Sequence, residues 1–62
     1  MIKENRIKRN YTQEELSEII GISPRQLQRI ETNEDKTSIT TMRKLIKILQ
    51  IPDREIIQYM KK

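Results

Sequence analysis

The single glycine of this chain separates two short amphipathic segments and limits what they can form. In residues 13–20 apolar side chains recur at the i, i+3, i+4 spacing of a helical face, at Leu16, Ile19 and Ile20. After Gly21 come Ser23 and Pro24, which suit an N-cap and a first helical position. Glycine tolerates the positive φ that a sharp helix end requires. The sequence therefore predicts two helices, 13–20 and 24–32, joined by a tight turn at Gly21.

The second of these helices has two different faces. Leu27, Ile30 and the stem of Glu31 form a face to be buried, whereas the opposite face carries Arg25, Gln28 and Arg29. In the major groove of DNA, arginine can bond guanine O6 and N7, and glutamine can bond adenine N6 and N7. Exposed helix faces commonly carry such residues, so from this triplet alone an ordinary solvated face remains the alternative.

Start and stop signals delimit the neighbouring segments. A first helix is expected over residues 2–9, with Ile2 and Ile7 as its apolar positions and Asn10 as its end. Thr12 is the expected N-cap of the 13–20 helix, and Glu15 three residues later completes a capping box. Asn33 can take the left-handed conformation that ends the 24–32 helix.

Two further helices are expected in the last third of the chain. Ser38 caps a fourth helix over residues 39–49, whose core face is Ile39, Met42, Leu45, Ile46 and Leu49. Its polar face is either a second phosphate-binding stripe or, more commonly for such faces, a solvated surface: Arg43, Lys44 and Lys47. The order Ile51, Pro52, Asp53 breaks the chain and starts a fifth helix.

The fifth helix carries a wide apolar arc, at Ile56, Ile57, Tyr59 and Met60. Either all four side chains close the core, or part of the arc is a homodimer contact, for which the candidates are Ile56, Tyr59 and Met60. Lys61 and Lys62 follow, and their positive charge complements the C-terminus of a helix.

Composition excludes most other functions. The chain has 62 residues, which suits a single domain over residues 1–62, and it contains no cysteine or histidine. A disulfide framework, a thiol nucleophile, an imidazole base and a zinc cluster are excluded, and no metal or cofactor is expected. The carboxylates lie on solvated helix faces, so we expect no enzyme.

No apolar run or signal peptide indicates a membrane, which favours the cytoplasm. The net charge of +4 and pI of 9.7 fit a polyanionic partner.

At several positions together the chain resembles the phage-repressor and Cro-type helix-turn-helix domains, also called the xenobiotic-response-element family. The resemblance rests on Arg6, residues 12–16, 21–23 and 29–31, Ser38-Ile39 and residues 49–52. It implies an all-α fold, a compact five-helix lambda-repressor-like domain whose helices 2 and 3 form the helix-turn-helix. It also implies that Arg6 makes a largely buried salt bridge with Glu31.

The resemblance and the residue types together assign roles on DNA. Base contacts are expected from Arg25, Gln28 and Arg29, with Pro24 offering an apolar contact to a thymine methyl. Phosphate contacts are expected from Thr12, Gln13, Ser23, Gln26, Lys36 and Thr37. Phosphate would repel Glu34 and Asp35, so either these carboxylates point away or this edge of the footprint is missing.

The function implied is sequence-specific binding of double-stranded DNA by a transcriptional regulator, a repressor, of a bacterium, phage or mobile element. A small domain reads few base pairs, so a palindromic operator and a homodimer are expected. The alternative is a protein-interaction module of the same fold, an antitoxin or a switch regulated by a protein or peptide partner. The acidic side chains of the 13–20 helix and of residues 34–35 favour that alternative.

Overall fold

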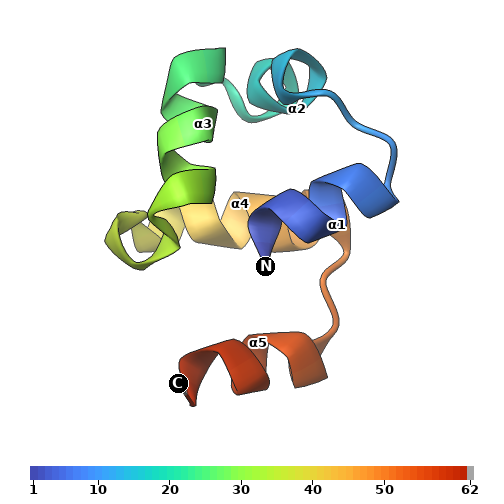
Figure 1. Cartoon of the computed structure of the whole chain (residues 1–62), viewed down its shortest axis with the longest axis vertical. Coiled ribbons are helices and arrows are strands. Elements are labelled where there is room, and N and C mark those ends of the chain that lie inside the picture. Colours follow the sequence, from blue (N-terminus) through green and yellow to red (C-terminus); the bar gives the residue numbers. More distant parts are fainter. Residues whose placement is uncertain (62) are drawn as a thin grey trace.

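The computed structural model describes residues 1–61, which form five α-helices, one short 3-10 helix and no strand. The helices are α1 (Ile2–Lys8), α2 (Gln13–Ile20), α3 (Pro24–Thr32), α4 (Ile39–Leu49) and α5 (Asp53–Met60), with η1 (Glu34–Lys36) after α3. The all-α, five-helix prediction is confirmed. In Figure 1, α2 and α3 lie on one side of α1 and α4, and α5 lies on the other. The expected role of Lys62 falls outside the described residues.

Local signals explain where α2 and α3 begin. Thr12 Oγ1 accepts a hydrogen bond from the Glu15 N–H at 3.0 Å, and Glu15 Oε1 accepts from the Thr12 N–H at 2.9 Å. Ser23 and Gln26 repeat this capping box at the start of α3, at 3.1 and 2.9 Å. Gly21 between the helices has a φ of +88°, in the left-handed region. These contacts set the helix-turn-helix geometry.

The core is small and is built from aliphatic side chains of α1 to α4 and of Ile51, which follows α4. Its fully buried members are Ile2, Leu16, Leu27, Leu45 and Leu49, with Ile20 and Ile51 almost fully buried. Partly buried side chains surround them, including Tyr11, Ile30 and Met42. From α5, Ile56 packs against this cluster. Leu27 is the side chain of α3 that anchors it in the core.

Two of the side chains expected in the core are exposed instead, so this part of the prediction is wrong. Ile19 is 52% exposed and Ile39 is 72% exposed. The face that α2 buries consists of Leu16, Ser17 and Ile20, because the small Ser17 lets neighbouring elements approach there and Ile19 is turned beyond them. Ile39 is the first residue of α4 and precedes the part of the helix that reaches the core. Ile7 of α1 is likewise 55% exposed.

The ends of the helices follow the expectation with one exception. Asn10, after α1, has a φ of 62° in the left-handed region as expected. Gln50, after α4, has a φ of 51° in the same region, which was not predicted from the sequence. Asn33 has a φ of −140°, so the left-handed conformation expected there is wrong. The chain does not reverse at this point, because it passes directly into η1. Ser38 Oγ accepts from the Thr41 N–H at 3.2 Å and caps α4 as expected.

Asn5 and Glu55 connect α1 to α5. Asn5 is only 4% exposed, and its Nδ2 donates to the Met1 carbonyl at 2.8 Å and to Glu55 Oε1 at 3.2 Å. A buried amide requires such partners. No helix among residues 1–61 is long and apolar enough to cross a membrane.

Candidate nucleic-acid interface

The α3 helix presents a polar face to solvent because its apolar residues anchor the other face. Leu27 is fully buried, and Ile30 and Glu31 are partly buried. The three side chains expected to read bases all lie on the exposed surface: Arg25, Gln28 and Arg29. Pro24, also exposed, occupies the first helical position after the Ser23 cap. The structure thus brings the predicted base-contacting residues together on one face of one helix.

An ion pair holds the C-terminal half of α3 against α1. Arg6 Nε lies 2.6 Å from Glu31 Oε2, and the two side chains are 11% and 4% exposed. Arg6 Nη1 also donates to the Tyr11 carbonyl at 2.8 Å. Gln13 Nε2 donates to Glu31 Oε1 at 3.0 Å. The Glu31 carboxylate therefore joins α1, the start of α2 and α3.

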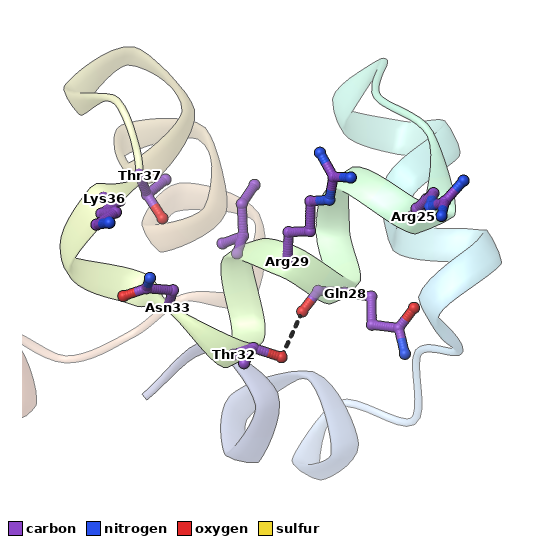
Figure 2. A pocket seen from close by; sticks show the side chains of 8 residues that line it. Arg25, Gln28, Arg29, Thr32, Asn33, Lys36 and Thr37 are labelled. Carbon is purple, nitrogen blue, oxygen red and sulfur yellow. Dashed lines mark hydrogen bonds between the residues drawn. The ribbon is translucent and has the colours of Figure 1, made fainter.

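A groove follows α3 toward η1, as Figure 2 shows. Its volume is about 560 Å³. Eight residues line it: Arg25, Gln28, Arg29, Ile30, Thr32, Asn33, Lys36 and Thr37. Three of these are cations and none is a carboxylate, so the groove favours an anionic group. It brings two predicted base-contacting arginines next to two predicted phosphate-contacting residues.

The two acidic residues of η1 do not face this groove. Glu34 Oε2 accepts from the Ile2 N–H at 2.7 Å, at the start of α1. Asp35 Oδ1 accepts from the Tyr59 hydroxyl at 2.7 Å. Of the two outcomes expected from the sequence, these contacts show that both carboxylates point away, which leaves Lys36 and Thr37 at the groove. The hydrogen bond to Asp35, with burial and the nearby negative charge adding to it, raises the pKa of Tyr59 to about 12.

The Thr37 hydroxyl is the one buried side-chain oxygen or nitrogen in the described part of the chain without a hydrogen-bond partner. Such an atom has lost its water without replacement, which costs about 1–3 kcal/mol. Thr37 is also one of the residues that line the groove.

The other predicted phosphate contacts lie at the two capping boxes. These boxes engage the hydroxyls of Thr12 and Ser23 and the side-chain oxygen of Gln26. The capping box of α2 uses the N–H groups of Thr12 and Glu15, so those of Gln13 and Glu14 point out of the helix end. The side chain of Gln13 donates to Glu31, the acidic partner of the Arg6 ion pair. The position of Gln13 in the sequence did not indicate this contact.

The three predicted dimer-contact residues lie in different surroundings on α5. Ile56 packs against the core, the Tyr59 hydroxyl binds Asp35, and Met60 is 76% exposed. Ile57, which the prediction did not include, is 51% exposed and lies three residues before Met60. Only Ile57 and Met60 combine large apolar side chains with high exposure on this helix.

Comparison with known proteins identifies the family. Residues 2–56 match the family model described as helix-turn-helix. Neither the curated proteins nor the solved structures gave a match. The family is one of DNA-binding domains and not of enzymes. The chain therefore belongs to the helix-turn-helix family of Cro/C1 type.

Proposed function

We propose that this domain is a transcriptional repressor that binds a specific double-stranded DNA sequence with α3 in the major groove. The observation that carries the proposal is the separation of the two faces of α3. Leu27, Ile30 and Glu31 hold the helix, while Arg25, Gln28 and Arg29 stay exposed on its other face. A rigidly held helix with exposed arginine and glutamine side chains is suited to reading base edges.

Arg25, Gln28 and Arg29 are the proposed base contacts. Bidentate bonds from arginine to guanine and from glutamine to adenine each discriminate by about 1–3 kcal/mol. Pro24, one turn before Gln28 on the exposed start of the helix, would contact a thymine methyl.

Phosphate contacts would lie on both sides of the base-reading face. Lys36 and Thr37 face the cationic groove after α3, and the unsatisfied Thr37 hydroxyl would gain a partner there. On the other side, the free N–H groups at the start of α2 suit a phosphate, which the positive end of a helix attracts. In this proposal Gln13 positions that helix start, and the side chains of Thr12, Ser23 and Gln26 support the two helix starts.

The operator is proposed to be palindromic and the protein to bind it as a homodimer. The exposed Ile57 and Met60 on α5, next to Tyr59, support pairing through this helix. In such a dimer the two α3 helices would lie about 34 Å apart, one turn of B-DNA.

An alternative function is protein binding, in an antitoxin or partner-regulated switch. The exposed carboxylates of Glu14 and Glu18, next to the half-exposed Ile19 on α2, favour it. Glu34 and Asp35, however, are engaged in contacts within the chain and no longer support this alternative.

Selection from a random duplex library at near-physiological salt, followed by sequencing, tests the proposal. Enrichment of an inverted repeat with half-sites about one helical turn apart is the expected result. Enrichment of one short half-site would support sequence reading but contradict the dimer. If nothing is enriched and all binding is lost as salt rises, the contacts are non-specific, and the alternative function is favoured.

A further inference from the structure

The α5 helix and the edge of the DNA-facing groove are connected by one hydrogen bond between distant residues. Tyr59 on α5 donates to Asp35 at 2.7 Å, although 24 residues separate them. Asp35 directly precedes Lys36 and Thr37, which line the groove. Tyr59 is not among the residues that line the groove, and Figure 1 shows α5 on the side of the molecule away from α2.

The η1 segment has few internal contacts that would fix its position. Within it, the Lys36 N–H donates to the Asn33 carbonyl at 3.2 Å and the Thr37 N–H to the Glu34 carbonyl at 3.1 Å. No side chain caps this single turn. Two of its side chains connect it to other elements: Glu34 accepts from the Ile2 N–H and the Met1 ammonium at the start of α1, and Asp35 accepts from the Tyr59 hydroxyl. A turn as short as this depends on such contacts for its order.

We propose that Tyr59 is a positioning residue for DNA binding, which acts through Asp35 to hold Lys36 and Thr37 at the groove. The inference rests on the proposed function of this face. It has two parts: the Tyr59–Asp35 hydrogen bond orders η1, and an ordered η1 strengthens the phosphate contact. The proposal also gives the Asp35 carboxylate a role as the acceptor for the Tyr59 hydroxyl. Without this role, its negative charge near a phosphate would only weaken DNA binding.

The coupling has a second consequence for α5. If Tyr59 orders the groove edge, a contact that moves α5 changes DNA affinity, and bound DNA changes the affinity for that contact by the same factor. The exposed Ile57 and Met60 lie on this same helix.

Hydrogen exchange without DNA tests the first part. In Tyr59→Phe, which keeps the ring, the Lys36 and Thr37 N–H groups should exchange severalfold faster than in the wild-type protein. The Gly21 N–H, which donates to the Ser17 carbonyl at 2.9 Å, is the internal control and should be unchanged. Equal exchange at Lys36 and Thr37 in both proteins would overturn the proposal, whether or not the chain binds DNA.

DNA affinity tests the second part, with two substitutions that remove the same charge. Asp35→Asn keeps an acceptor for the Tyr59 hydroxyl, whereas Asp35→Ala does not. On the selected operator, Asp35→Ala should bind about threefold to tenfold more weakly than Asp35→Asn, the effect of one hydrogen bond. If Asp35 acted only through its charge, the two variants would bind equally, and the proposal would be wrong.

Two further measurements separate this inference from the proposed function. Tyr59→Phe should reduce the slope of log affinity against log salt concentration by about one, as the loss of one phosphate contact does. If Arg25→Ala loses specific binding while Tyr59→Phe keeps wild-type affinity and salt dependence, only the positioning role fails. If the wild-type protein itself prefers no sequence, the proposed function fails, and hydrogen exchange still decides whether Tyr59 orders η1.

Discussion

Arg6 Nε and Glu31 Oε2 lie 2.6 Å apart across 25 residues of sequence, and both side chains are nearly covered. The pair joins α1 to the C-terminal half of the helix proposed to read bases. Gln13 adds a third element, because its amide donates to the other Glu31 oxygen at 3.0 Å. The orientation of α3 therefore depends on polar contacts as well as on the burial of Leu27.

Glu31→Gln should destabilise the fold strongly. The substitution leaves the Arg6 guanidinium covered without an opposite charge, and loss of one partner from a buried pair costs about 3 kcal/mol or more. Urea unfolding followed by circular dichroism measures the loss. Glu14→Gln is the matched control, because it makes the same chemical change on α2 at a glutamate that is exposed. An equal, small change in both variants would contradict a structural role for the pair.

Arg25→Ala and Lys36→Ala should weaken DNA binding in different ways. Loss of a base contact from Arg25 should cost about 1–3 kcal/mol on the operator and relax the preference at one base pair. Loss of a phosphate contact from Lys36 should weaken binding to all sequences alike and reduce the salt dependence by about one. Affinities on a panel of single-base operator variants distinguish the two profiles. Identical profiles would show that these roles are assigned wrongly.

Protonation of Glu15 should lower the free energy of unfolding in mild acid. Its hydrogen bonds with the Thr12 N–H and then the Thr12 hydroxyl lower its pKa below 4.5. A lowered folded-state pKa adds stability above the unfolded pKa, and this stability is lost as pH falls through the folded pKa. Glu15→Gln keeps the capping box without titrating, so it should lose less stability than the wild type between about pH 5 and 3. Parallel losses in urea unfolding at these pH values would contradict the prediction.

Gly21→Ala should destabilise the turn through the backbone alone. A Cβ at this position would meet nothing within 4 Å, so no clash is introduced. The φ of +88° is nevertheless unfavourable for alanine, by about 1–2 kcal/mol. Gly21→Asn should cost less, since asparagine tolerates the left-handed region better. Chemical denaturation of both variants measures this order. If the Gly21→Ala variant were as stable as the Gly21→Asn variant, the backbone explanation would be wrong.

Tyr59 should ionise only in strong alkali. Its hydrogen bond to Asp35 raises its pKa from 10.0 to about 12. A raised folded-state pKa adds stability below the unfolded pKa of 10, and this stability is lost as pH rises through 12. The absorbance difference between wild type and Tyr59→Phe, followed against pH, reports this ionisation. In the Asp35→Ala background the same difference should appear at lower pH. An unchanged midpoint would show that Asp35 does not bind Tyr59 in solution.

The local features of the fold could be predicted from the sequence because their partners are close in the chain. The Thr12–Glu15 capping box and the Ser23 N-cap join residues three apart, and Gly21 ends α2 through its own backbone conformation. The return bond, from the Ser23 N–H to Gln26 Oε1, was not predicted. Periodicity also identified the core stripe, but not its width. Ile19 and Ile39 fit the helical spacing and are exposed, because the pattern of one helix does not show how far its neighbours extend.

Long-range polar contacts could not be predicted in the same way. Asn5 interrupts the apolar pattern of α1, and its burial depends on Glu55, fifty residues away. The direction of Glu34 and Asp35 depends on Ile2 and Tyr59. Arg6 with Glu31 is the exception, because the resemblance to a family, and not the residue pattern, indicated that pair.

The division of α3 into two faces also bears on how such a domain can change its target. The residues that hold the helix are Leu27, Ile30 and Glu31, and none of them is among the proposed base contacts. Substitutions at Arg25, Gln28 and Arg29 would therefore alter the operator preference while the packing stays the same. If this face reads the operator as proposed, mutation can change the regulatory target without first lowering the folded population of the protein.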